Sequence, residues 1–586
     1  MTLRLLALIT STSLLISCAS FSTTELSSPQ QTDQPSQTDS SARSETVEVY
    51  RPIPADTLYS LLVAEVAGQR QRFDISLYHY MDQARKTQDA DISERATRIA
   101  QYVGSSELAD EAITIWLSSK PEDPAAHQAA AQLAMDSGQF DEALNHLESL
   151  FQLAQISQFD YLAANAARQP ETRKRRLLKS LESLSDQYPQ NANLFQARAI
   201  IEQQLGMYDE ALAHTDYAVS LQQSYLSAKI QKARLLAQMQ RVDDAIEWLD
   251  ELEEEKPQHK GIAVLKARLL LQQRRMDEAL QAFANLNSNF PDDMAILLSL
   301  ALLEEELGDS DTAKTHLQQL LDSNSHENEA NFYLGNIARE RGDKETALSH
   351  YRLVKGGREF LAAHLQASEL IAELEGLNAA REYLNELRGA YPQQTTPLIR
   401  IEVQLLTNAD EKEEAMILLS QALTVAPQDY DLLYTRAMLA EQLDNLELLE
   451  QDLRFLISLK PDHAEALNAL GYTLADRTDR WDEALPLVEK ALSLSPNNPA
   501  IIDSLGWIYF RSGDFDRALP LLKQAFEILV DHEIAAHYGE ILWITGDKVQ
   551  ARAVWQQGLN NKPDSEIIQR TLERLNVDNP PQAQSE

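Results

Sequence analysis

The chain repeats one pattern three times between residues 464 and 563, as AEALNALGYTLADRTDRWDEALPLVEKALSLSP (464–496), NNPAIIDSLGWIYFRSGDFDRALPLLKQAFEIL (497–529) and EIAAHYGEILWITGDKVQARAVWQQGLNNKP (533–563). Counted from residues 464, 499 and 532, each copy has a small residue at its eighth place, namely Gly471, Gly506 or Gly539. Each also has alanine at or directly after its twentieth place, namely Ala484, Ala518 or Ala551, and a small residue near its twenty-seventh. Because protein interiors are close-packed, two helices can cross closely only where both carry small side chains. The spacing therefore predicts a hairpin of two helices in every copy.

This pattern is the helix–turn–helix signature of a tetratricopeptide repeat. Eighth-place residues recur at intervals of 33 to 35 residues back to Ala199, and closing prolines follow the same register. We therefore predict an all-α, superhelical solenoid with about 11 clear repeats over residues 186–575. Looser helical pairs with degenerate repeats are expected over residues 52–185, because terminal repeats of such stacks are atypical. The polar residues 576–586 predict a disordered tail.

The overall composition and the absence of catalytic motifs narrow the function. The chain has 90 acidic and 52 basic residues, a formal net charge of −38, which argues against nucleic acid as a partner. It has no Gly-rich phosphate loop, no GxSxG and no HExxH, and no two histidines stand at metal-ligand spacing. We therefore expect no catalytic residue, no cofactor and no metal. The sequence predicts a non-enzyme that works through its surfaces.

The N-terminus resembles that of a bacterial lipoprotein. Residues 1–17 carry one early arginine and an apolar stretch too short to span a membrane, and they end in Leu-Ile-Ser before Cys18. The resemblance to a lipobox implies a signal peptide over 1–17 and a lipidated Cys18. Residues 18–51 are rich in Ser, Thr, Gln and Pro and predict a disordered tether. Ala19 in place of Asp favours sorting to the outer membrane, facing the periplasm. The alternative is an ordinary signal peptide cleaved a few residues later.

Four aromatic residues stand at places expected to face the inner groove of the solenoid. They are Tyr472 and Trp507 at the ninth place, and Phe510 and Trp543 at the twelfth. Aromatic clusters are enriched in binding hot spots. We expect this patch to bind a partner, and alanine at Trp507 and Trp543 to leave the helical stack intact. The alternative is that the superhelix or the tail covers the patch.

Two groups of basic residues stand out in the acidic chain. The inner places in the middle of the chain are polar and include Arg234 and Arg268, which could set specificity without marking a particular ligand. The run Arg173–Arg176 has two interpretations, a solvated helix start or loop and a partner-facing patch.

A family resemblance rests on the region before the clear repeats. That region reads PADTLYSLLVAE (54–65), then AGQR (67–70), FDI (73–75) and ISERATRIA (92–100). With the lipobox before it and about a dozen repeats after it, the chain resembles the LbcA-type tetratricopeptide lipoproteins. The resemblance implies an outer-membrane adaptor that binds and activates a periplasmic carboxyl-terminal processing protease. It also implies that the adaptor helps to present substrates of that protease, notably peptidoglycan hydrolases.

Three other classes of protein are less consistent with the sequence. An assembly lipoprotein for outer-membrane or secretion machinery would have only a handful of repeats. A scaffold for cell-wall synthases would carry an additional α/β domain, and no run of alternating strands and helices is evident. A superhelical lytic transglycosylase would need a lysozyme-like domain, for which the chain has no room.

Overall fold

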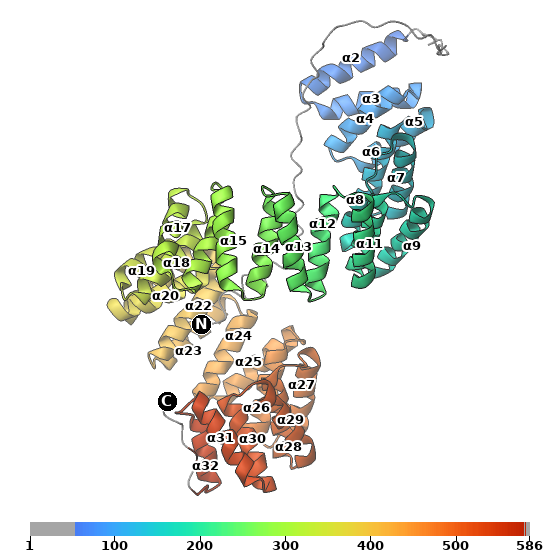
Figure 1. Cartoon of the computed structure of the whole chain (residues 1–586). Coiled ribbons are helices and arrows are strands. Elements are labelled where there is room, and N and C mark those ends of the chain that lie inside the picture. The colour runs from blue at the N-terminus through green and yellow to red at the C-terminus, as the bar shows by residue number, and fades with distance from the viewer. Residues whose placement is uncertain (1–52, 579–580, 582–586) are drawn as a thin grey trace. The chain divides into compact units, whose positions relative to one another are not determined.

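The computed structural model describes residues 53–578 and residue 581. The predicted signal peptide, the lipidated Cys18 and the tether over 18–51 lie outside these described residues. Every regular element among the described residues is helical, with 31 α-helices and no strand, so the prediction of an all-α repeat solenoid is confirmed (Figure 1). The contacts divide the chain into two units, one up to His316 and one from Leu317.

The helices of the first unit are α2 (Ala55–Gln69), α3 (Phe73–Thr87), α4 (Ala90–Tyr102), α5 (Ser106–Ser119), α6 (Pro124–Asp136), α7 (Phe140–Ala154), α8 (Phe159–Asn165), the 3₁₀ turn η1 (Ala166–Arg168), α9 (Glu171–Gln187), α10 (Ala192–Gln204), α11 (Tyr208–Leu221), α12 (Leu226–Gln238), α13 (Val242–Glu255), α14 (Lys260–Gln272), α15 (Met276–Asn289) and α16 (Met294–Glu306). The boundary between the units falls within α17 (Ser310–Asp322).

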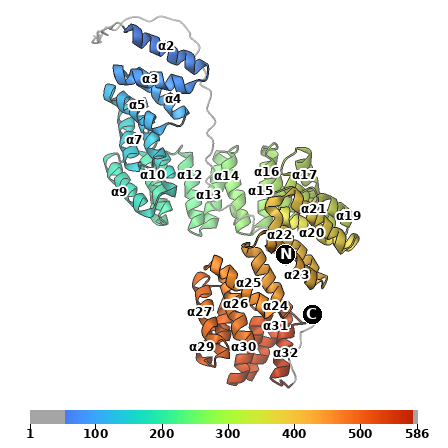
Figure 2. The ribbon, with the colours of Figure 1, turned by 180° about the vertical axis from the view of Figure 1, so that it is seen from behind.

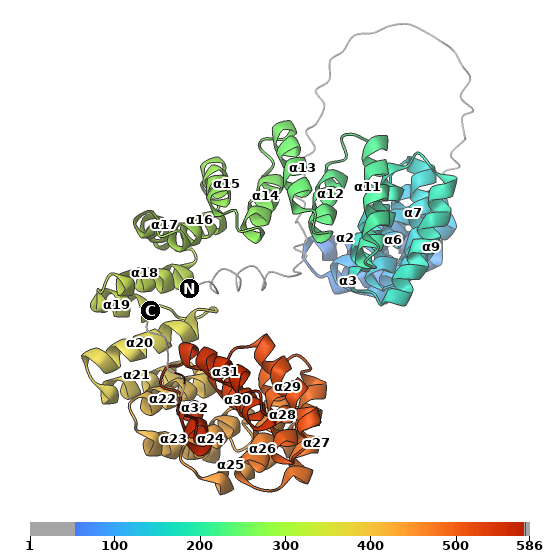
Figure 3. The same ribbon diagram turned by 60° about the horizontal axis from the view of Figure 1, so that its bottom comes forward.

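The helices of the second unit are α18 (Glu327–Glu340), α19 (Lys344–Tyr351), α20 (Phe360–Leu374), α21 (Leu377–Ala390), the 3₁₀ turn η2 (Pro392–Gln394), α22 (Thr395–Asn408), α23 (Lys412–Val425), α24 (Tyr430–Gln442), α25 (Leu446–Leu459), α26 (Ala464–Arg477), α27 (Trp481–Leu494), α28 (Pro499–Arg511), α29 (Phe515–Ile528), α30 (His532–Thr545), α31 (Lys548–Asn561) and α32 (Glu566–Arg574). Their order can be followed in Figure 3.

Small residues hold the two helices of each repeat close together, as their spacing predicts. Where α26 crosses α27, a Cβ atom on Gly471 would lie 2.4 Å from Cγ2 of Val488 and 3.0 Å from the carbonyl oxygen of Ala484. The same place in α12 and α14 is held by Ala233 and Ala267, which are both fully buried. A larger side chain at these places would force the two helices apart, and overpacking of this kind typically costs about 1–3 kcal/mol.

The turns between the paired helices use left-handed backbone conformations. Gly513 and Gly546 have φ angles of +87° and +103° at the ends of α28 and α30. Glycine adopts this conformation without strain. Asp444 takes the same conformation, with φ +56°, between α24 and α25. The turn geometry therefore persists in repeats that lack the glycine.

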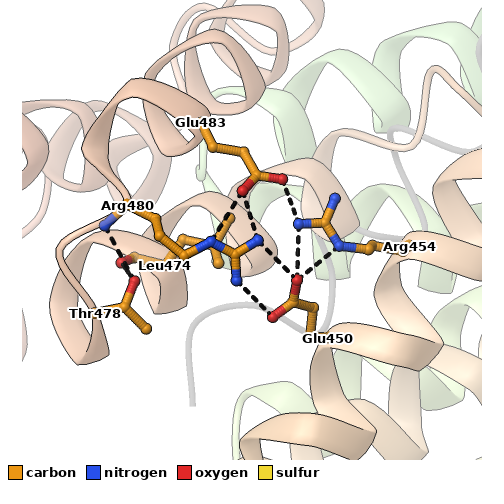
Figure 4. Close-up of polar contacts among 6 residues, drawn as sticks. All are labelled: Glu450, Arg454, Leu474, Thr478, Arg480 and Glu483. Atoms are coloured by element: carbon orange, nitrogen blue, oxygen red, sulfur yellow. Dashed lines mark hydrogen bonds and ion pairs between the residues drawn. The ribbon is translucent and has the colours of Figure 1, made fainter.

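An ion-pair network joins two consecutive repeats through α25 and α27 (Figure 4). Arg480 lies between two carboxylates, with Nη1 2.9 Å from Oε2 of Glu450 and Nη2 2.5 Å from Oε2 of Glu483. Arg454 also binds both carboxylates. The hydrogen bond from Arg480 is the largest cause that lowers the pKa of Glu450. Because all four side chains are partly exposed, the network contributes more to the register of the repeats than to their stability.

Helix α2 stands at one end of the first unit, beside α3 (Figure 2). Apolar side chains on α2, among them Leu58, Leu62 and Val66, remain exposed. Exposure of this kind is expected where a terminal helix of a stack has no further neighbour. Within residues 53–578, no helix combines the length and the apolar character that crossing a membrane needs.

The basic run lies at the start of α9, which begins at Glu171. Arg175 pairs with Glu171 at 2.7 Å, and Arg176 pairs with Asp141 of α7 at 3.0 Å. Both arginines are exposed. The structure therefore places the run at the start of a helix, and a partner-facing role for Arg173–Arg176 stays a prediction.

The C-terminal end of the described chain packs further than expected. We predicted the disordered tail to begin at Asn576, but Val577 is buried and its amide donates to the carbonyl oxygen of Leu572 at 3.1 Å. The side chain of Arg552 also reaches the carbonyl oxygen of Asp578 at 2.6 Å. The residues after Asp578, except residue 581, lie outside the described part.

Candidate partner-binding face of the C-terminal repeats

The first helices of the last repeats lie against one another and form one face, here called the inner face. Direct contacts join α26 to α28, α28 to α30 and α30 to α32. The clearest sign of this convergence is a hydrogen bond from the hydroxyl of Tyr472 on α26 to Oε1 of Glu533 on α30, at 2.8 Å. These residues are 61 positions apart, almost two repeats. Ninth-place residues of the repeat therefore point toward the inner face, as the sequence predicts.

The structure gathers three of the four predicted aromatic residues around His537 of α30. The ring of Trp507 stacks on the imidazole of His537, with centroids 3.9 Å apart. The ring of Phe510 also stacks on that of Trp507, with centroids 4.9 Å apart, and the ring of Tyr472 lies 5.9 Å from His537. Trp543 lies elsewhere, with its ring 5.7 Å from that of Trp555.

Burial distinguishes these aromatic residues. Trp507 is 5% exposed and Phe510 is 8% exposed, whereas Tyr472 and Trp543 are partly buried. For Trp507 and Phe510, the structure thus shows the alternative in which the solenoid covers the patch. The physical reason is the convergence of α26, α28 and α30, which brings the neighbouring helices over these rings. A partner-binding role for the four residues stays a prediction, and Tyr472 and Trp543 are the members with exposed surface.

A network of buried polar groups surrounds the aromatic rings. Nδ1 of His537 lies 2.8 Å from Oδ2 of Asp503, and both side chains are buried. The indole nitrogen of Trp507 donates to Oδ1 of Asp476 at 2.9 Å. Arg511 donates to the same carboxylate at 3.2 Å and to the carbonyl oxygen of Asp476 at 2.8 Å. Buried polar groups are costly unless they are paired, so this network specifies how α26, α28 and α30 fit together.

The acidic surroundings raise the pKa of His537. Burial alone would lower the pKa of this imidazole, but the charge of Asp503 and the hydrogen bond to it outweigh that effect and raise the pKa above 6.5, with smaller contributions from Glu533 and Asp476. The pair between the imidazolium and Asp503 is therefore fully formed below pH 6.5 and is lost as the pH rises through the raised value.

One carboxylate near the inner face stands out by its electrostatic environment. Glu441 of α24 is partly buried and makes no hydrogen bond or ion pair within the described part of the chain. Burial raises its pKa first, and the negative charge of Glu533 raises it further, with Asp476 adding a smaller effect. Arg477 opposes these effects but does not cancel them. A cation that docked beside Glu441 would relieve both the repulsion and the loss of hydration.

Replacing Glu441 with Gln should raise the melting temperature at pH 7.5 and leave it unchanged near pH 4. The folded-state pKa of Glu441 is raised from 4.5, so its ionised form destabilises the fold at pH values above the raised value. Below about pH 4.5 the carboxyl is protonated in both states, and the substitution removes no charge. Thermal unfolding followed by circular dichroism at both pH values measures the difference. An equal change at the two pH values would show that the charge of Glu441 is not the cause.

Trp543 carries its own cationic neighbours. Nζ of Lys548 lies 4.7 Å from the ring centroid, and the guanidinium carbon of Arg552 lies 5.3 Å from it. Both cations come from α31, the second helix of the same repeat. The indole ring thus already contacts two cations of its own repeat. Less of its surface is available to a partner than its repeat position suggested.

Sequence reasoning missed the polar half of this face. His537, Asp503, Asp476, Glu533 and Glu441 did not appear among the predicted site residues. Asp503 and His537 are 34 residues apart, one repeat length, so complementary charges at neighbouring inner helices were the available signal. Nowhere in the described part of the chain do three or more His, Cys, Asp or Glu side chains gather in a way that could hold a metal ion.

Comparisons with known families agree with the repeat architecture. Two family models described as "Tetratricopeptide repeat" match, one at residues 462–529 and one at residues 264–313 and 298–362. A model described as "Anaphase-promoting complex, cyclosome, subunit 3" matches residues 204–286.

One similar protein matches this chain over most of the length of both proteins. The TPR repeat-containing protein PA4667 of Pseudomonas aeruginosa is 40% identical over 528 residues, which cover 90% of this chain and 89% of that protein. Human protein O-mannosyl-transferase TMTC1 is 26% identical over 179 residues, which cover 29% of this chain and 20% of that protein.

Solved structures with a similar arrangement of helices are much more distant in sequence. The APC/C hetero-tetramer Cut9-Hcn1 covers 89% of this chain and 97% of its own, with a TM-score of 0.31 and 14% identity. The complex of Naa15/Naa10 bound to HypK-THB covers 90% and 86%, with a TM-score of 0.35 and 16% identity.

Proposed function

This chain belongs to the family of TPR repeat-containing proteins that includes PA4667 of Pseudomonas aeruginosa, and from that premise we propose that it is a non-enzymatic adaptor anchored at the bacterial outer membrane. Its TPR scaffold suggests protein–protein interaction. In the proposal, lipid on Cys18 holds the chain at the membrane, facing the periplasm. The repeats bind and activate a periplasmic carboxyl-terminal processing protease and help to present its substrates, which include peptidoglycan hydrolases.

The observation that carries the adaptor proposal is the unpaired carboxylate of Glu441, which other negative charges surround near the inner face of the last repeats. Glu441 has no partner in the described residues, while Glu533 and Asp476 add negative charge around it. Tyr472 is partly buried beside them and already donates to Glu533. Such a surface favours a basic segment of a partner, with the tyrosine ring as an adjacent apolar contact.

Activation of a protease by this chain requires no catalytic group of its own. A partner that exchanges between an inactive and an active state is shifted toward the active state by any protein that binds that state more tightly. A rigid inner face can do so by holding two segments of the partner at a fixed separation.

The proposal is tested by capturing partners with the tagged, detergent-solubilised full chain from its own cells and identifying them by mass spectrometry. A carboxyl-terminal processing protease among the main partners would support the proposal. Cell-wall synthases or secretion components without the protease would leave the repeat scaffold in place and overturn the proposed function.

Glu441→Lys should lower the yield of the captured protease by about tenfold, because it places a like charge before a basic segment. Glu447→Lys is the matched control, since Glu447 is exposed on α25, away from the inner helices. Equal losses in the two variants would show that net charge, and not the inner face, determines capture.

A further inference from the structure

The inner helices α12 and α14 of the first unit present two arginines at the same place of consecutive repeats. Arg234 and Arg268 each follow the fully buried crossing residue of their helix, Ala233 or Ala267. In the second unit, this ninth place is held by Tyr472 and Trp507, which point toward the inner face. By the repeat register, both arginines are therefore expected to face the inner side of their own unit.

These two arginines lack the carboxylate partners that their neighbours have. Lys232, two residues before Arg234, pairs with Asp216 at 2.8 Å, and Lys266, two residues before Arg268, pairs with Asp250 at 2.5 Å. Arg234 and Arg268 are exposed and make no hydrogen bond or ion pair among the residues that the structure describes. In a chain with 90 acidic residues, a pair of uncompensated arginines on consecutive repeats is a specific arrangement.

The environment of Arg234 already penalises the charge of this residue. The surrounding protein lowers the pKa of Arg234 first by desolvation, and the positive charge of Arg268 lowers it further. Both arginines are nevertheless exposed, so a ligand can reach both guanidinium groups. Two neighbouring positive charges of this kind are stabilised by an anion that binds both guanidinium groups.

The residues beside the arginines are apolar or neutral. One turn before and one turn after each arginine on its helix stand the following residues: Ile230 and Gln238 on α12, and Val264 and Gln272 on α14. The three residues on each helix therefore offer an aliphatic side chain, a guanidinium and an amide. None of them is a carboxylate that would repel an acidic ligand.

We propose that Arg234 and Arg268 form a binding site for carboxylates of an extended acidic segment of a partner protein. Arginine suits this ligand because its planar guanidinium can donate two parallel hydrogen bonds to one carboxylate. Ile230 and Val264 contact the aliphatic parts of the segment, and Gln238 and Gln272 satisfy its backbone. The site is separate from the acidic inner face of the second unit and does not depend on the protease role.

The test uses the full chain and a fluorescein-labelled peptide of alternating Ser and Glu with a free C-terminus, followed by fluorescence anisotropy at low salt. Each single variant, Arg234→Gln or Arg268→Gln, should weaken binding about tenfold, and the double variant should abolish it. Lys179→Gln, at an exposed lysine of α9 without an ion pair in the described residues, is the charge-matched control and should bind normally. Replacing Glu in the peptide with Gln, or amidating its C-terminus, shows which carboxylate is bound.

A second variant distinguishes a loss of binding from a loss of folding. The charge-reversed chain, Arg234→Glu with Arg268→Glu, should bind the matching Ser-Lys peptide and reject the Ser-Glu peptide, while its circular dichroism spectrum stays that of the wild type. No binding of the acidic peptide by the wild type, or equal binding by the double Gln variant, would overturn the proposal. So would wild-type dimerisation that the double Gln variant abolishes, because the arginines would then join two copies of this chain.

Discussion

Replacing Trp507 with alanine should destabilise the last repeats by about 3–5 kcal/mol, the usual cost of deleting a buried tryptophan ring. The ring is almost fully buried and stacks on both the imidazole of His537 and the ring of Phe510. Its indole nitrogen also donates to Asp476. Truncation would therefore leave a cavity and remove one hydrogen bond from a buried network. Urea unfolding followed by circular dichroism measures the loss.

Trp543→Ala is the informative comparison for Trp507→Ala. Trp543 is only partly buried, and cations from α31 lie over its ring. We expect its replacement to cost less than half as much as that of Trp507. This outcome would correct the expectation from the sequence that both substitutions leave the stack intact. Unchanged stability of Trp507→Ala would instead show that the ring does not hold α28 against α30.

Replacing Arg436 with methionine should destabilise the second unit by about 3–5 kcal/mol, because it leaves a buried carboxylate unpaired. Asp452 of α25 is 2% exposed. Arg436 of α24 binds it with two parallel hydrogen bonds, from Nε to Oδ2 and from Nη2 to Oδ1, both at 2.7 Å. The substitution is costly because it removes the positive charge and leaves the buried carboxylate of Asp452 in place.

Two further variants separate this cause from general damage to the repeat. The double variant Arg436→Met with Asp452→Leu should recover most of the lost stability, since no buried charge then remains unpaired. Arg570→Met breaks an exposed pair with Glu566, 2.8 Å apart, and should change the free energy of unfolding by less than about 1 kcal/mol. If the double variant were as unstable as Arg436→Met, the lost packing of the arginine stem would be the main cause.

The helical hairpins and their turns could be predicted from the sequence because local packing determines them. A small residue at the eighth place reports directly on a close crossing, as Gly471 and Val488 show. Glycine after the first helix reports on a left-handed turn, as at Gly513. Both signals lie within one repeat. They can therefore be recognised from the repeat pattern without knowledge of the remaining chain.

The state of the candidate site depends on contacts between repeats, which the repeat pattern does not encode. The register placed Trp507 and Phe510 on the inner helices but could not show how closely α26, α28 and α30 converge. That convergence buries the two rings and creates the pair between His537 and Asp503. For Arg234 and Arg268 the register was sufficient to place the residues, but their lack of carboxylate partners became evident only in the structure.

The most direct test of the adaptor proposal is the rate at which the purified carboxyl-terminal processing protease cleaves a purified peptidoglycan hydrolase, with and without the full chain. The account predicts faster cleavage with the wild-type chain, a much smaller increase with Glu441→Lys, and a normal increase with Glu447→Lys. An unchanged cleavage rate with the wild-type chain, at concentrations where it binds the protease, would contradict the proposed activation.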